Sequence, residues 1–307
     1  MRSREKCRTE YSIDYVTLFS ILSEKYKEDL MIIKDDYRRI VEKIKAGKAH
    51  ELSEGDTRYL GACTKGSTAE KSLQPQYYND SIPAKRRAFS LKQSYMSYLI
   101  NHYLLQEAET ADAAFSQEEL ERMDFEAEVI RRIDQYKGKT EEELCRIFGI
   151  ASRSKQTNHL IVSRMLGVKT DNVAEFEKAD IEIKTIRVQK NGKPKESMSF
   201  PVIKIKQFVS EEFEDSRLYR FFSEKRFLFV VFREREDGEF ALSGARFWNM
   251  PVSDLGTTGR KEWEAYQQKF MEGVEFIIKE RADGGYRVLN DLPTTKTTKI
   301  FHLRPHA

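Results

Sequence analysis

The spacing of apolar residues predicts four helices in the first 166 residues. In the segment 35–46, apolar side chains recur every three or four residues, which is the period of one helix face, and Gly47 ends the run. Ser116 stands three residues before Glu119, a spacing at which each side chain can bond the backbone of the other, so a helix is expected to begin there. The predicted helices cover residues 35–46, 117–136, 140–148 and 158–166.

A different period begins at residue 181. Ile181 and Ile183 alternate with Glu182 and Lys184, and successive side chains of a strand point to opposite faces. The isoleucines are therefore expected in the core, with the two charged side chains together on the other face. Strands are also predicted over 202–208 and 227–232, and the second is so apolar that burial on both faces is expected. Helices leading into such strands predict an α/β fold with a mixed central sheet flanked by helices.

An acid-rich segment with few large apolar residues, 107–119, is expected to divide the chain. We place a first domain at 1–105, a linker at 106–116 and a second domain at 117–307. The end of the first domain, 88–105, is expected to be helical or partly extended.

A weak internal repeat relates the two parts. The segments 36–47 and 262–273 are both predicted helices that end at a glycine. Each is followed by a polar segment and then by a short strand with a loop, at 59–66 and at 300–307. The matching order of these features indicates two related copies.

Composition narrows the class of protein. The 307 residues carry 53 Lys and Arg against 50 Asp and Glu, a net charge of +3, so total charge alone does not indicate nucleic acid. Basic residues nevertheless gather at 85–87 and 184–206, and such local patches can hold phosphates. No apolar run is long enough for a membrane helix, and the three distant cysteines fit a reducing cytoplasm. No phosphate-binding loop, dinucleotide motif or nucleophile elbow is present, so no small-molecule cofactor is expected.

The triplet Glu182-Ile183-Lys184 has the residue types that a metal-dependent nuclease needs. Carboxylates match the oxygen preference of Mg²⁺, which polarises a scissile phosphate and helps to activate water. A neighbouring lysine can orient that water or offset developing charge. The same triplet also fits a solvent-facing ion pair on a strand, because this chain is rich in both residue types.

The context of this triplet resembles a known family. The stretch I-E-I-K-T-I-R-V at 181–188, followed by N-G-K-P-K-E at 191–196, resembles the MutH mismatch-repair nicking enzyme and the related GATC-cutting type II restriction endonucleases. Lys225-Arg226 with its following apolar strand looks like the segment that carries an additional family lysine. The segment 35–103, with K-A-H-E-L-S-E-G-D-T-R-Y-L-G-A-C-T-K-G, is similar to the last third of such a domain.

The resemblance implies a restriction-endonuclease-like fold with a partial second copy of its C-terminal part. Larger members of this family are tandem duplications, in which the first domain cuts and the second binds DNA as an effector. We therefore expect this chain to be a fragment or a shortened relative, with the tail of one domain followed by most of a second. A homodimer on DNA is also expected.

The resemblance further implies catalytic roles for Glu175, Glu182, Lys184 and Lys225, with Glu175 and Glu182 as ligands of Mg²⁺. The family pattern, an aspartate followed after six residues by E-x-K, places Glu175 where an aspartate is expected. Ser163 stands where the family has a helix glutamate, and Asp180 is an alternative acid that lies close to Glu182. These departures favour a degenerate nuclease site.

The resemblance also implies a loop that carries a basic residue to base edges, since lysine and arginine match the acceptors of guanine. Lys65 falls on that position in the first copy, and Gly66 allows close approach of the backbone. Other basic residues are expected at phosphates, which position a protein without reading sequence. The residues expected to bind DNA are Thr64, Lys65, Gly66, Lys85, Arg86, Arg87, Lys92 and Arg304.

Three functions stay open at this point. The first is a DNA-binding effector part of a restriction endonuclease that recognises a GATC-type site in double-stranded DNA. The second is an active Mg²⁺-dependent endonuclease that uses Glu182 and Lys184. The third is a protein-interaction module that keeps the fold without binding DNA, which the near-neutral charge favours.

Overall fold

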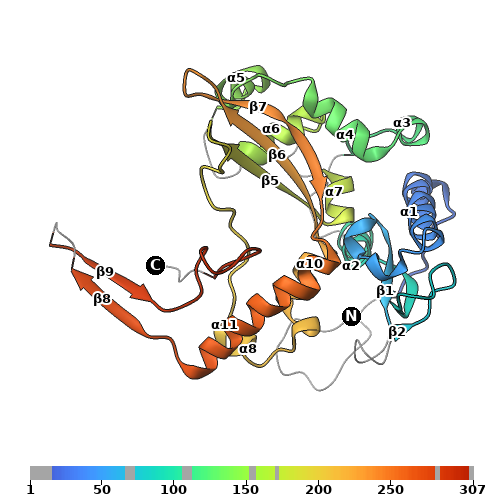
Figure 1. The fold of residues 1–307 in the computed structure, drawn as a ribbon. Coiled ribbons are helices and arrows are strands. Elements are labelled where there is room, and N and C mark those ends of the chain that lie inside the picture. The colour runs from blue at the N-terminus through green and yellow to red at the C-terminus, as the bar shows by residue number, and fades with distance from the viewer. Residues whose placement is uncertain are drawn as a thin grey trace.

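The structure, a computed structural model, describes residues 16–65, 73–105, 113–151, 157–169, 173–280 and 284–303. Its first part contains one long helix and two short antiparallel strand pairs, β1 with β4 and β2 with β3 (Figure 1). The elements of this part are η1 (Glu24–Tyr26), α1 (Lys27–Lys45), η2 (Ala49–Glu51), η3 (Glu54–Asp56), β1 (Leu60–Thr64), β2 (Leu73–Gln74), β3 (Ala84–Lys85), β4 (Arg87–Leu91), α2 (Gln93–Leu99) and the π-helical η5 (Ile100–Leu104).

The second part is built on a three-stranded mixed sheet of order β5-β6-β7, in which β5 is parallel to β6 and β7 is antiparallel to it. Helices α4 to α7 lie against this sheet (Figure 1). This arrangement confirms the predicted α/β class with helices flanking a mixed sheet. The elements are α3 (Gln117–Arg122), α4 (Phe125–Asp134), α5 (Glu141–Phe148), α6 (Thr157–Met165), α7 (Ala174–Ala179), β5 (Ile181–Val188), α8 (Ile205–Phe208), η6 (Phe213–Asp215), α9 (Arg217–Glu224), β6 (Arg226–Glu234), β7 (Phe240–Trp248), α10 (Val252–Asp254), the π-helical η7 (Leu255–Gly259), α11 (Arg260–Glu272), β8 (Phe276–Glu280) and β9 (Tyr286–Asn290).

Two predicted elements are wrong in detail. The helix expected over 117–136 is two helices, because Asp124 accepts a hydrogen bond from the backbone N–H of Ala127 and so begins a new helix. The segment 202–208 is not a strand: it holds the short helix α8 and exposes Val202. Its alternating pattern resembles a strand, but no described strand pairs with it, and Phe208 is buried by packing against Trp263 instead.

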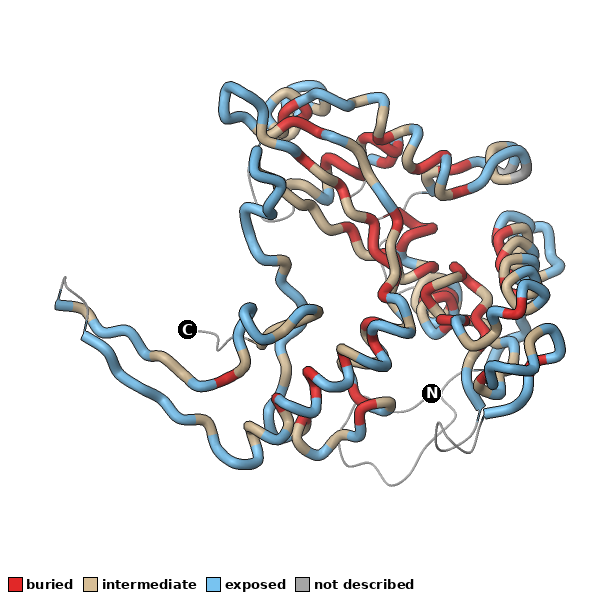
Figure 2. Tube along the Cα trace, viewed as in Figure 1, coloured by how far each residue is buried: buried red, intermediate tan, exposed pale blue. Residues whose placement is uncertain are grey.

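One hydrophobic core joins the parts that the sequence analysis separates. Tyr59 and Tyr95 stack with ring centroids 4.9 Å apart and share this core with Phe115, Val129 and Leu228. Figure 2 shows buried residues in both parts of the chain. A second core lies around Trp263 and Tyr266 of α11. Residues before and after the expected linker are thus buried against each other.

The two helices of the expected repeat, α1 and α11, both end before a glycine with positive φ, Gly47 at 73° and Gly273 at 104°. After α1 the chain reaches strand β1. After α11 it forms the hairpin of β8 and β9, which extends from the body with exposed apolar side chains, and residues 300–303 form no strand (Figure 1). Among the described residues, no helix has the length and apolar character needed to cross a membrane.

Candidate nuclease and DNA-binding sites

Strand β5 places Glu182 and Lys184 on one face, as the alternation predicts. Ile181 and Ile183 are 9% and 6% exposed and face the core, whereas the two charged side chains are only partly buried. The Lys184 ammonium lies 2.7 Å from Oε1 of Glu182 and also donates to the carbonyl of Ser199 at 3.0 Å. The two residues form an ion pair.

Lys225 joins this pair from the position just before β6. Its Nζ donates to Oδ1 of Asp180 at 2.8 Å and lies 3.4 Å from Oε2 of Glu182. Because Ile181 pairs with Arg226 in the parallel ladder, the preceding residues of both strands, Asp180 and Lys225, are brought side by side. We call Asp180, Glu182, Lys184 and Lys225 the carboxylate–lysine cluster.

In this cluster, each carboxylate and each ammonium group favours the charged form of its neighbours. Burial works to raise the pKa of Glu182, but the hydrogen bond from Lys184 and the charges of Lys184 and Lys225 outweigh it and hold that pKa below its ordinary value. Burial works to lower the pKa of Lys225, but the carboxylates of Asp180 and Glu182 outweigh it and raise that pKa. Carboxylate and ammonium are therefore both charged at neutral pH.

Glu175 is not brought into this cluster. It lies in α7, is 5% exposed, and its carboxylate accepts hydrogen bonds from the backbone N–H groups of Ala114 and Phe115 at 3.1–3.2 Å. Burial raises the pKa of Glu175, with these hydrogen bonds acting in the opposite direction. Its carboxylate ties the end of the expected linker to the second part of the chain. Ser163, at the family's helix-glutamate position, is fully buried in α6.

This donor set does not fit Mg²⁺. Each oxygen of Glu182 faces an ammonium, and Oδ1 of Asp180 already accepts from Lys225. Within the described ranges, no group of three or more His, Cys, Asp or Glu side chains is arranged to hold a metal ion. Hard cations require several oxygen ligands, usually with negative charge among them, and the free oxygens here are too few.

A second set of predicted residues meets at the end of the β1–β4 pair. Thr64 ends β1 and Lys65 follows it, and the backbone N–H of Lys65 donates to the carbonyl of Arg86 at 2.8 Å. All three side chains are exposed, and no described group forms an ion pair with Lys65. We call Thr64, Lys65 and Arg86 the cationic edge. Gly66 and Arg304 lie outside the described residues.

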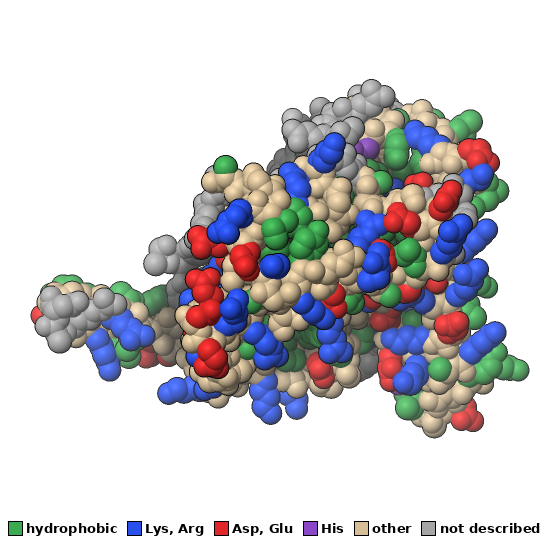
Figure 3. Space-filling model, turned by 90° about the horizontal axis from the view of Figure 1, so that it is seen from above, with side chains coloured by type: hydrophobic (Ala, Val, Ile, Leu, Met, Phe, Trp, Pro, Cys, Tyr) green, Lys and Arg blue, Asp and Glu red, His purple; other side chains and the backbone are tan. Residues whose placement is uncertain are grey.

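The other predicted DNA-binding residues have partners within the fold. Lys85 pairs with Glu214 at 3.3 Å, and Arg87 donates to the carbonyls of Ala62 and Leu52. Lys92 is 7% exposed and donates to the carbonyl of Thr57, so its ammonium is not presented at the surface. Burial lowers the pKa of Lys92 to about 8. Elsewhere on the surface, basic and acidic side chains are interspersed, as the face in Figure 3 shows, in keeping with the near-neutral total charge.

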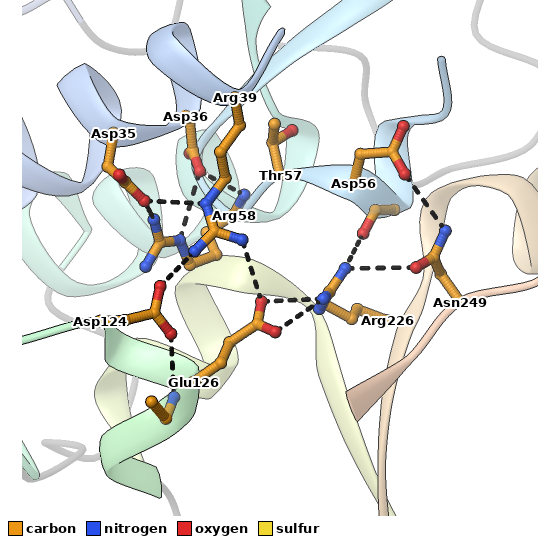
Figure 4. Close-up of polar contacts among 12 residues, drawn as sticks. Asp35, Asp36, Arg39, Asp56, Thr57, Arg58, Asp124, Glu126, Arg226 and Asn249 are labelled. Atoms are coloured by element: carbon orange, nitrogen blue, oxygen red, sulfur yellow. Dashed lines mark hydrogen bonds and ion pairs between the residues drawn. The ribbon is translucent and has the colours of Figure 1, made fainter. Parts of the chain in front are cut away.

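A polar network between the two parts of the chain was missed by the sequence analysis. Arg226 at the start of β6 is buried and donates to the carbonyl of Gly55, to Asn249 and to Glu126 (Figure 4). A Cβ on Gly55 would lie 2.9 Å from that of Asn249, so only glycine permits this approach. The sequence signal that could have indicated this network was a charged residue, Arg226, at the start of an apolar strand.

On the helix side of this network, Asp36 is fully buried. Its carboxylate accepts hydrogen bonds from the backbone N–H groups of Arg58, Tyr59 and Leu60 at 2.6–3.0 Å. Arg39, one turn further along α1, lies 2.5 Å from Asp124 (Figure 4). Helix α1 thus fixes the start of β1, the strand that carries the cationic edge.

Comparison with known proteins gives two findings. Residues 166–243 match the family described as DNA mismatch repair enzyme MutH, a region that contains the whole carboxylate–lysine cluster. The chain is also 36% identical over 313 residues to the type II restriction enzyme Sau3AI of Staphylococcus aureus. That similarity covers 96% of this chain and 64% of the relative, so the chain spans a little under two thirds of the longer protein.

Proposed function

Because this chain is related to the MutH-like restriction endonucleases, we propose that it binds double-stranded DNA at a GATC-type site, as the DNA-binding part of such an enzyme. The proposal includes a degenerate nuclease site. The relative Sau3AI is a type II restriction enzyme.

The observation that carries the DNA-binding proposal is the cationic edge. Lys65 is exposed at the end of a strand whose start is fixed by the buried carboxylate of Asp36. Arg86 is exposed on the neighbouring chain segment, which is bonded to Lys65 through the backbone. An exposed cation on a rigid element can reach a base edge or a phosphate at little conformational cost. We assign Lys65 to base reading and Arg86 to a phosphate.

The geometry around Glu175 supports the degenerate site. An acid that is buried and held by two backbone N–H groups is not available beside Glu182. Since catalytic groups need placement to about 0.5 Å, the remaining pair of Glu182 and Lys184 falls short of the implied constellation.

A gel-shift titration in Ca²⁺, which supports binding without cleavage, tests the proposal. The full chain should prefer a duplex with one GATC over the same duplex with GTAC. Lys65→Ala should lower affinity for GATC by roughly 5- to 100-fold and remove the preference, because one good base contact discriminates by about 1–3 kcal/mol. Lys261→Ala, which removes an exposed lysine of α11, is the matched control and should bind normally. Equal binding of both duplexes by the unaltered chain overturns the proposal and favours a protein-interaction module.

The same titration separates the remaining candidates. Replacing Ca²⁺ with Mg²⁺ should leave the GATC duplex intact. Cleavage that disappears in Lys184→Ala would instead assign an active nuclease to Glu182 and Lys184, which do share one face of β5. Sedimentation of the bound complex tests the expected homodimer, because two copies per duplex are predicted.

A further inference from the structure

Lys225 occupies a defined place between two carboxylates. Its ammonium contacts Asp180 at 2.8 Å and Glu182 at 3.4 Å, and its side chain is only 20% exposed. The contact to Asp180 depends on backbone shape, because Asp180 ends α7 with a φ of 54°, in the left-handed region. This conformation is uncommon for a residue with a side chain, and aspartate is among those that tolerate it best.

The parallel ladder makes this placement a property of the fold. Asp180 and Lys225 each precede the first residue of a strand, and those first residues, Ile181 and Arg226, are partners. Arg226 is in turn clamped by Gly55, Asn249 and Glu126. The backbone that carries Lys225 is therefore fixed on both sides.

The charges of the cluster sum to zero. Two carboxylates, Asp180 and Glu182, face two ammonium groups, Lys184 and Lys225. A divalent cation entering here would have to displace an ammonium from both carboxylates, and it would meet no net negative charge. Carboxylates that lose such a partner repel each other, and a bound cation is one way to relieve that repulsion.

We infer that the Lys225 ammonium is the resident cation of this site: it takes the place between Asp180 and Glu182 that a divalent metal ion would otherwise occupy. The inference rests on the proposed function, in which the chain binds DNA without cutting it. It explains how β5 can carry the residue pattern of a nuclease without binding metal. The four charges of the cluster then neutralise one another, and no metal ion is bound. Removal of the Lys225 ammonium should allow a divalent metal ion to bind.

Mn²⁺ binding to the DNA-free full chain tests this, measured by electron paramagnetic resonance and by calorimetry. The unaltered chain should show no saturable site in the millimolar range. Lys225→Met should gain one site, with affinity about tenfold or more above the unaltered chain, since the competing charge is gone. Adding Glu182→Gln to that variant should remove the gained site.

Two controls make the result specific. Lys225→Arg keeps a cation in place and should gain nothing. Lys190→Met removes the ammonium of an exposed ion pair with Glu236 and should also gain nothing.

Two results would overturn the inference. One is a folded Lys225→Met chain without Mn²⁺ binding, with folding checked by circular dichroism. The other needs no variant of Lys225: saturable Mn²⁺ binding by the unaltered chain that is lost in Glu182→Gln. Neither depends on DNA, so failure of this inference is distinguishable from failure of the GATC preference in the gel shift.

Discussion

The cationic edge and the carboxylate–lysine cluster both present lysines on strands or directly beside them, but their electrostatic surroundings are opposite. In the cluster, Lys184 and Lys225 lie 2.7–3.4 Å from carboxylates and are 20% exposed. At the edge, Lys65 is exposed and forms no ion pair within the described part of the chain. A cation that has a carboxylate partner stabilises the fold, whereas one without a partner is free to meet an anion. Lysine thus stabilises the fold in the carboxylate–lysine cluster. At the cationic edge, by our proposal, it recognises DNA.

Removing the support of the edge should have the largest effect. Asp36→Ala leaves three backbone N–H groups without their acceptor and removes one of the two carboxylates that the buried Arg58 contacts, so we expect a loss of about 3–5 kcal/mol in the free energy of unfolding. Urea unfolding measures it. Asp215→Ala, which removes an exposed carboxylate that only lies 4.0 Å from Arg220, should cost about 1 kcal/mol or less. Equal costs would mean that Asp36 does not hold β1.

The buried Lys92 and the exposed Lys65 should differ in how their contribution to the free energy of unfolding depends on pH. Burial lowers the pKa of Lys92 to about 8 from an ordinary 10.5, so the folded chain gives up this proton at lower pH than the unfolded chain does. Stability contributed by Lys92 should therefore rise between pH 8 and 10.5 and level off above that window.

The measurement is the difference in free energy of unfolding between the unaltered chain and Lys92→Met across this pH range. We expect a change on the order of 2 kcal/mol, in favour of the unaltered chain as pH rises. Lys65→Met, at an exposed position, should show a flat difference. A flat difference for Lys92→Met would show that its ammonium is not buried in solution.

The smallest expected effect is on the salt dependence of DNA binding. If Arg86 contacts one phosphate, Arg86→Ala should reduce the slope of log affinity against log salt by about 0.9. Lys225→Met, within the cluster, should leave that slope unchanged because the charge that it removes is already paired with carboxylates. Gel shifts of the GATC duplex over a range of salt concentrations measure both slopes. An unchanged slope in Arg86→Ala would remove it from the DNA contacts.

Local pattern was sufficient for several features. The alternation at Ile181 and Ile183 predicted which face of β5 is buried, and the spacing of Ser116 and Glu119 predicted where a helix begins. These features depend on interactions between residues that are close in sequence, so they can be predicted from the sequence alone. The predicted strand at 202–208 failed for the complementary reason, because a strand needs a partner and alternation alone does not supply one.

The sequence by itself determined the α/β class, the face on which Glu182 and Lys184 meet, and the resemblance that points to DNA. Only the tertiary structure decided which charged residues are free. It turned Glu175 toward the N–H groups of Ala114 and Phe115, buried Lys92 against Thr57, and left Lys65 exposed. A charge is attracted or displaced by whatever groups the fold brings within a few ångströms, and those groups come from distant parts of the chain.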